Sequence, residues 1–172
     1  MQVLFIIFSL LFTSSIYDLQ YNNIDGLAQS MDQYRGKKIL IVNIATESSR
    51  VHQLAGLQQL HERYGDSLVI IGFPSNSFSH EPRDNEGIKQ FCQSQYGTTF
   101  LLAEKNSVTQ SGMQSIYAWL TTINENGVMG SPVGADFQKF LINESGQLIG
   151  VFSPKVDPLS PELTSAIEIS QN

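Results

Sequence analysis

Two aliphatic runs separated by a segment of helical length restrict the fold of this chain more than any other feature. Residues 38–45 form a near-continuous apolar run rich in β-branched side chains, and residues 68–73 form a second one. Such runs are typical of strands buried on both faces of a sheet. Between them, apolar residues recur at steps of three and four over residues 51–64, and Gly65 marks a helix end. This region therefore predicts a right-handed strand, helix and strand unit.

The remainder of the chain, within a total of 172 residues, predicts one α/β domain with a sheet covered by helices. A polar loop follows Pro74 and extends through Asn85. Two further helices are expected at residues 88–96 and 113–120, with a strand at 99–103 between them. Residues 139–142 and 148–152 flank the turn residues 143–147, which predicts an antiparallel hairpin. A final helix is expected to begin at Ser160 and Pro161, with the serine hydroxyl as its cap.

The N-terminal residues predict a targeting segment. Nine of the ten residues from 3 to 12 are apolar, and Thr13, Ser14 and Ser15 supply small side chains for cleavage. We therefore expect residues 1–14 to be a secretory signal peptide and residues 15–172 to be the domain. The run is too short for a stable membrane span, which needs about 20 apolar residues. Export to a periplasmic or extracellular compartment is predicted, and a cytoplasmic location is the alternative if this run is not a signal.

Charge and cysteine content exclude several classes of function. Ten Lys and Arg against sixteen Asp and Glu give a net charge of −6, so no nucleic-acid partner is expected. Cys92 is the only cysteine, which excludes an internal disulfide and any two-thiol redox cycle within the chain. Its place beside Phe91 on an apolar helix stripe indicates an inert buried thiol. His52 and His61 lack metal-ligand spacing, so no metal or cofactor is expected, and no sequence feature specifies an oligomeric state.

Short motifs, in order along nearly the whole chain after residue 15, resemble the glutathione peroxidase family of the thioredoxin-like fold. They include Tyr-Arg-Gly-Lys-Lys at 34–38, Ile-Val-Asn-Ile-Ala at 41–45, Phe-Pro at 73–74 and Asp-Phe-Gln-Lys-Phe-Leu at 136–141. The resemblance implies a central mixed β-sheet flanked by helices, with an opening strand at 15–19. It also implies an oxidoreductase of the oxidative-stress response that reduces peroxides with a thiol donor as partner.

The resemblance further implies that the family's active site is altered here. In the family a Cys or selenocysteine attacks the peroxide, surrounded by Gln, Trp and Asn side chains; the matching positions in this chain hold Ser48, Ser77, Ala135 and Asp136. Ser75 stands where thioredoxin-dependent members often carry a resolving Cys. Because a hydroxyl cannot form a sulfenic acid, we expect a catalytically inactive or repurposed binding homologue. A small ligand or a thiol donor would then occupy a pocket that includes Asn76 and His80.

Two other functions remain open on the sequence. One is residual peroxidase activity by a route that the motifs do not show. The other is a hydrolase with Ser48 as nucleophile, His80 as base and Asp136 as the orienting carboxylate, although no Gly-x-Ser-x-Gly elbow surrounds Ser48. Ala135 in place of a large indole predicts a concavity between Ser48 and Ala135, which either binding or hydrolysis would use.

Overall fold

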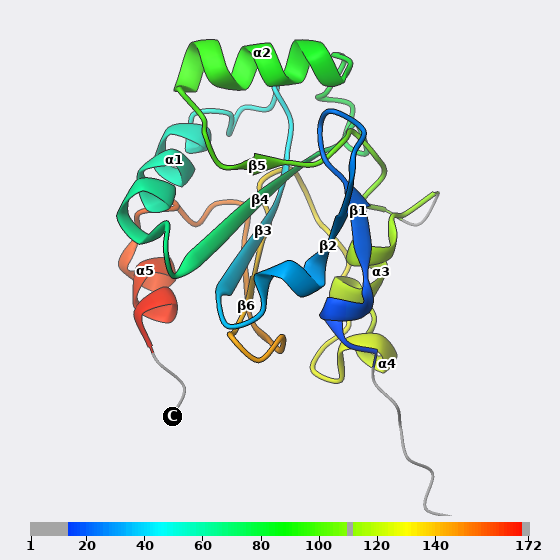
Figure 1. Cartoon of the computed structure of the whole chain (residues 1–172). Helices are drawn as coiled ribbons and strands as arrows, with labels where there is room; N and C mark the ends of the chain where they lie inside the picture. The colour runs from blue at the N-terminus through cyan, green and yellow to red at the C-terminus, as the bar shows by residue number, and fades with distance from the viewer. Residues whose placement is uncertain (1–13, 110–111, 170–172) are drawn as a thin grey trace, which may run out of the picture.

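A five-stranded mixed sheet forms the centre of the computed structural model, which describes residues 14–109 and 112–169 (Figure 1). Its strand order is β5-β4-β3-β6-β7. The strands are β3 (Lys38–Ile44), β4 (Leu68–Pro74), β5 (Leu101–Leu102), β6 (Lys139–Ile142) and β7 (Leu148–Phe152). β3, β4 and β5 run parallel, whereas β6 is antiparallel to β3 and β7 is antiparallel to β6. The predicted mixed sheet is therefore confirmed. Except for Ser14, the predicted signal peptide lies outside the described residues.

The helices cover both faces of this sheet. They are α1 (Gln53–Tyr64), α2 (Asn85–Tyr96), α3 (Ser115–Thr121), α4 (Ile123–Asn126) and α5 (Pro161–Glu168). In Figure 1, α1 and α5 lie on one side of the sheet, and α3 lies on the other side near the hairpin of β1 (Gln20–Asn22) and β2 (Ala28–Ser30). Because α1 connects the parallel strands β3 and β4, the predicted strand, helix and strand unit is confirmed.

Alternating residues of β3 divide the hydrophobic core into two clusters, one on each face of the sheet. Ile39 and Ile41 belong to the cluster that holds the α3 residues Ile116, Tyr117, Trp119 and Leu120. Leu40 and Val42 belong to the cluster that holds Leu54, Leu57 and Leu60 of α1 with Leu163 and Ile167 of α5. Every residue of β3 is buried. This two-sided burial explains why the strand reads as a continuous apolar run instead of an alternating one.

Two local predictions are wrong. The expected opening strand at 15–19 is a 3-10 helix, η1 (Ile16–Asp18), because Ser15 and Asp18 form a capping box that closes this turn; β1 begins only at Gln20. Ser160 does occupy the N-cap of α5, with Pro161 as the first helical residue, but its hydroxyl forms no capping hydrogen bond. The carbonyl of Ser160 accepts the Leu163 amide instead, at 3.2 Å, so this early donor is already satisfied.

Within the described residues, no helix combines the length and the apolar character needed to cross a membrane.

Candidate active site

The topology brings the sequence-predicted site segments to one edge of the sheet. The turn that carries Ser48 follows the carboxyl end of β3, and the segment 75–77 follows the carboxyl end of the parallel strand β4. Ala135 and Asp136 precede β6, which runs antiparallel to β3 and so begins at the same edge. In open α/β sheets, binding sites commonly lie beyond the carboxyl ends of the parallel strands.

Ser48 is nearly buried in the turns that lead into α1, with 3% of its surface exposed. Its amide donates to the carbonyl of Ala45 at 3.3 Å, and its Oγ accepts from the amide of Arg50 at 3.3 Å. The hydroxyl oxygen is therefore engaged by its own turn. Such a contact positions the side chain locally and does not activate it as a nucleophile.

Glu81 fixes this turn from the neighbouring loop, and sequence reasoning did not single it out as a site residue. Its fully buried carboxylate accepts from the amide and from the hydroxyl of Thr46, both at 2.7 Å. The amide of Glu47 also donates to the carbonyl of His80 at 3.0 Å. These contacts hold the loop that carries His80 against the turn that carries Ser48. An acidic residue before proline in a polar loop was the only sequence signal for this role.

His80 and Asp136 form a close polar pair at the site. Nδ1 of His80 lies 2.6 Å from Oδ2 of Asp136, with the imidazole N–H donating to the carboxylate. Asp136 is 1% exposed, whereas about half of the His80 side chain is exposed. The structure thus brings together the base and the orienting carboxylate of the hydrolase hypothesis. Among the described residues, however, no hydrogen bond joins His80 to Ser48.

Buried contacts hold Asp136 in place from the β3 side. The side chain of the fully buried Asn43 donates through Nδ2 to the carbonyl of Ala135 at 3.0 Å. The backbone carbonyl of Asn43 accepts from the amide of Phe137 at 2.7 Å. Phe137 adopts a left-handed conformation with φ of 67°, which is uncommon for a residue with a side chain. Asn43 therefore secures a turn that the backbone alone disfavours, and this turn sets the position of Asp136.

A buried lysine supports the same turn from the other side. Nζ of Lys139 donates to the carbonyl of Phe137 at 2.8 Å and to Oε1 of Gln53, in the first turn of α1, at 2.6 Å. Burial lowers the pKa of Lys139 to about 8; the carboxylate of Asp157 opposes this shift and the charge of Arg50 adds to it. The lysine thus joins the beginning of β6 to the beginning of α1.

Ser77 contacts the loop at 105–109. The hydroxyl of the fully buried Ser75 donates to Oγ of Ser77 at 2.9 Å, and Oγ of Ser77 accepts from the amide of Val108 at 3.1 Å. Asn76 also has a structural contact, since its Oδ1 accepts from the amide of Glu81 at 2.9 Å. A pocket of about 360 Å³ opens beside Asn76 and Ser77. Ser48 and Ala135 line neither this pocket nor the other four characterised among the described residues, so the expected concavity is not among them.

Cys92 is fully buried within the cluster formed by α1, α2 and α5. Burial raises the pKa of its thiol to about 12, with the carboxylate of Glu81 adding to the shift. Because the thiolate is the reactive form, a thiol of this kind is almost wholly unreactive near neutral pH. Within the described residues no group of three or more His, Cys, Asp or Glu side chains is arranged to hold a metal ion.

Comparison with known proteins identifies the family. The sequence model described as "Glutathione peroxidase" matches residues 16–121. The chain belongs to the glutathione peroxidase family. It is 36% identical over 151 residues to glutathione peroxidase-like peroxiredoxin 2 of Saccharomyces cerevisiae, covering 86% of this chain and 93% of the yeast protein. It is 35% identical over 146 residues to a glutathione peroxidase of Lactococcus lactis subsp. cremoris, covering 84% of this chain and 92% of the relative.

Solved structures show the same fold for this glutathione peroxidase family member. The crystal structure of Trgpx in apo form superposes with a TM-score of 0.69 at 25% identity, covering 91% of this chain and 97% of Trgpx. A thioredoxin family thiol:disulfide interchange protein from Chlorobium tepidum superposes with a TM-score of 0.63 at 14% identity, covering 90% of this chain and 97% of that protein. The thioredoxin-like fold implied by the sequence resemblance is therefore confirmed.

Proposed function

We propose that this glutathione peroxidase family member does not reduce peroxides through a thiol, and that its altered site binds a small ligand instead. The observation that carries the proposal is the state of Cys92, the only thiol in the chain, which is fully buried with a pKa raised to about 12. Peroxide reduction needs an accessible thiolate or selenolate. Thiol-dependent peroxide reduction is the reaction of the family. The residues at the matching positions of this chain argue against its retention here.

The chemistry of the family reaction explains why hydroxyls cannot replace the thiol. A thiolate attacks one peroxide oxygen, the O–O bond breaks, and the products are an alcohol and a sulfenic acid on the enzyme. Two donor thiols then restore the enzyme thiol, releasing water and a disulfide. Ser48 and Ser75, at the positions matched to the attacking and resolving cysteines, cannot accept and return an oxygen in this way.

The charges around Ser48 also disfavour an anionic nucleophile there. The residue before Ser48, Glu47, is exposed, and its carboxylate lies 3.4 Å from the guanidinium of Arg83. Asp136 adds a buried carboxylate at the same edge of the sheet. Because Glu47 is paired with Arg83, the opposing charge is that of Asp136, whose carboxylate raises the free energy of an anion formed at this edge and so opposes activation of Ser48.

A hydrolase based on Ser48 is the second candidate, and the 2.6 Å contact between His80 and Asp136 is the observation that favours it. In such an enzyme, His80 would take the proton of the Ser48 hydroxyl while Asp136 holds the imidazole. This function requires a hydrogen bond from Ser48 to His80 that forms with substrate.

The apolar residues near the N-terminus bear on the compartment in which the protein acts. We propose that residues 1–14 direct export and that the domain acts in a periplasmic or extracellular compartment. Mass spectrometry of protein from whole culture tests this proposal. A mature chain in the exported fraction that begins near Ser15 supports it, whereas an intact chain confined to the cytoplasm contradicts it.

Restoring the missing nucleophile tests the proposed function. Ser48→Cys, the wild type and Cys92→Ser are compared for reduction of hydrogen peroxide and an organic hydroperoxide, with glutathione and separately with thioredoxin as donor. We expect no turnover by any of the three, because Ser77, Ala135 and Asp136 still replace the supporting residues. Turnover by Ser48→Cys alone would contradict the proposal that the site has been repurposed. It would show that the site still supports peroxide reduction once a sulfur replaces the Ser48 oxygen.

A further inference from the structure

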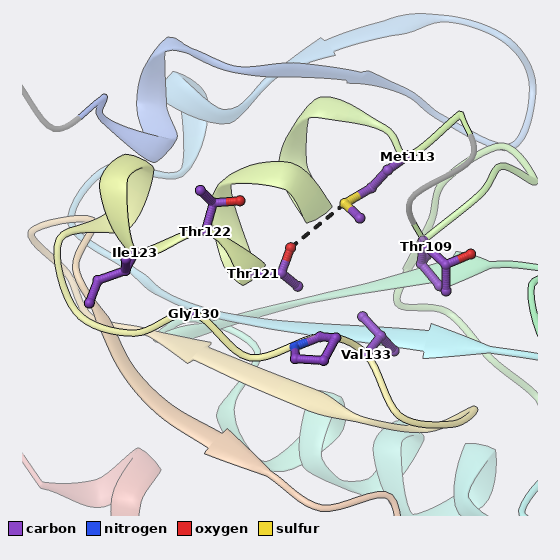
Figure 2. Close-up of a pocket in the computed structure, with 9 residues that line it drawn as sticks. Thr109, Met113, Thr121, Thr122, Ile123, Gly130 and Val133 are labelled. Carbon is purple, nitrogen blue, oxygen red and sulfur yellow. Dashed lines mark hydrogen bonds between the residues drawn. The ribbon is translucent and has the colours of Figure 1, made fainter.

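An apolar pocket lies between the α3–α4 junction, the residues Val108, Thr109 and Met113, and the loop at 130–133 (Figure 2). Its volume of about 550 Å³ lies within the range of small-molecule sites. Its walls include the side chains of Val108, Met113, Ile123 and Val133, and none of its lining residues among those described is ionisable. Ile123 is 53% exposed although it is aliphatic. The pocket is therefore an accessible apolar surface at the edge of the core.

The hydroxyl of Thr121, one of three threonines that line this pocket, adds little polarity. In Figure 2 the side chain of Thr121 lies close to Met113, and its hydroxyl is 3.7 Å from the methionine sulfur. The same hydroxyl donates to the carbonyl of Tyr117 at 2.7 Å. Because this donor is already satisfied within α3, a ligand here would meet mainly apolar atoms.

A polar pocket adjoins the apolar one at Thr109, which lines both. This second pocket, of about 360 Å³, contains Ser77 and Ser107, and Lys105 is its only ionisable lining residue. Val108 connects the two pockets. It lines the apolar pocket, and its amide donates to Oγ of Ser77, in the polar pocket, at 3.1 Å. The two surfaces therefore meet along one short stretch of chain.

Lys105 gives the polar pocket an unneutralised positive charge. Its Nζ donates to the carbonyl of Arg83 at 2.5 Å and forms no ion pair among the described residues. The adjacent Glu104 lines a different pocket, where its carboxylate accepts from Asn22 at 3.1 Å. The Ser107 hydroxyl already donates to the carbonyl of Thr109 at 3.0 Å, so the ammonium of Lys105 and the hydroxyl of Ser77 are the groups that complement one negative charge here.

We propose that the joined pockets bind an aliphatic monocarboxylate, with its tail in the apolar pocket and its carboxylate beside Lys105 and Ser77. The inference rests on the proposed binding function and names its ligand class. Burial of the tail supplies the favourable free energy, and the head group fixes its direction. Ser77 thereby connects the ligand site to one of the four altered positions of the family's active site.

Calorimetric titration with decanoate, below its micelle concentration, tests the inference on the full-length chain. Decyltrimethylammonium has a similar tail with the opposite charge, and acetate has the head group without the tail. We expect saturable binding of one decanoate per chain, at least tenfold weaker binding of decyltrimethylammonium, and no measurable binding of acetate. Absence of saturable decanoate binding would overturn the inference, and so would equal affinity for the two amphiphiles.

Substitutions separate the head-group contact from the tail contact. Lys105→Gln should weaken decanoate binding about tenfold, equivalent to about 1.4 kcal/mol, while Lys155→Gln, a matched change at an exposed lysine, should leave it within about twofold. Gly130→Leu should weaken binding by filling the apolar pocket. A Cβ at Gly130 would lie 3.4 Å from the nearest atom, the amide nitrogen of Ile123, so the fold should accept this change. Equal decanoate affinities for Lys105→Gln and the wild type would place the head group elsewhere and contradict the inference.

A second filling variant keeps the tail contact testable. Thr122→Phe adds bulk at an exposed lining residue, and thermal unfolding verifies that each variant is folded. If decanoate binds normally to both folded filling variants, the apolar pocket is not its site. Peroxide turnover by the wild type would refute the proposed function while leaving a positive titration intact, and a negative titration with no turnover would refute only the ligand assignment.

Discussion

His80 and Asp136, which are separated by 56 residues along the chain, meet at 2.6 Å between Nδ1 and Oδ2. This contact connects the loop after β4 to the segment before β6, so it joins two of the three segments that form the site. A half-exposed imidazole held by a buried carboxylate occurs in catalytic triads, where it activates a nucleophile. The same pair also occurs without a catalytic role, where it only joins two segments of the fold. The hydrogen bond from the Arg50 amide to the Ser48 hydroxyl favours the structural interpretation.

A serine-reactive fluorophosphonate distinguishes these interpretations. We expect no labelling of Ser48 in the folded wild type, because the side chain is 3% exposed and no hydrogen bond to His80 activates it. Intact-mass spectrometry provides the measurement, with His80→Ala as the control. Stoichiometric labelling that disappears in His80→Ala would instead establish the Ser48 hydrolase.

The thiol of Cys92 should be inaccessible in the native protein. Its complete burial and a pKa raised to about 12 predict negligible reaction with Ellman's reagent near neutral pH. In denaturant, one thiol per chain should react, matching the single cysteine of the sequence. Rapid reaction of the folded protein would show that this region of the core opens readily.

Lys139 should make the stability of the protein increase with pH above about 8. Its pKa is lowered from 10.5 to about 8 in the folded state, so between these values the unfolded chain binds more protons than the folded one. The unfolding free energy therefore rises across this window, and the full effect is about 3 kcal/mol. Below pH 8 both states are charged, and the penalty for burying the ammonium is fully present.

Substitution by methionine isolates this contribution from other titrating groups. The unfolding free energy of the wild type minus that of Lys139→Met should increase between pH 8 and pH 10.5, as measured by urea denaturation at each pH. A difference that is flat with pH would show that the Lys139 ammonium has an ordinary pKa in the folded protein.

The two N-caps of α2 and α5 should respond differently to removal of their side chains. Asp84 caps α2 through a 2.9 Å hydrogen bond from the amide of Gly87, whereas the Ser160 hydroxyl forms no capping bond at α5. Asp84→Ala should cost about 1 kcal/mol of unfolding free energy, and Ser160→Ala less than about 0.5 kcal/mol. Equal losses in chemical denaturation would mean that Ser160 caps its helix in solution.

Local sequence pattern was sufficient for the long and regular elements. The expected hairpin strands coincide with β6 and β7, because two short apolar runs on either side of a polar turn are local signals. The hairpin of β1 and β2 and the short helix α4 carry no such periodicity. The chain just after β1 is placed by a distant contact, the amide of Ile24 donating to the carbonyl of Leu102 at 2.8 Å. Its conformation therefore depends on tertiary structure.

The sequence was sufficient to predict which segments form the candidate site, but not which hydrogen bonds its side chains make. Parallel strand ends place the segments of Ser48 and Ser77 at one edge, and the structure agrees. The direction in which Ser77 points depends on Val108, which lies in a loop of no regular pattern. The apolar pocket was not foreseen for the same reason, since its walls come from three separate segments near α3 and α4.

Steady-state peroxide reduction by the wild-type protein shows whether this chain retains the reaction of its family. Hydrogen peroxide and an organic hydroperoxide are each supplied with glutathione or thioredoxin at neutral pH. We expect a rate equal to the protein-free blank and unchanged in Cys92→Ser, because the only thiol is buried. Turnover above the blank that disappears in Cys92→Ser would contradict this expectation, and would make this buried cysteine the peroxidatic residue.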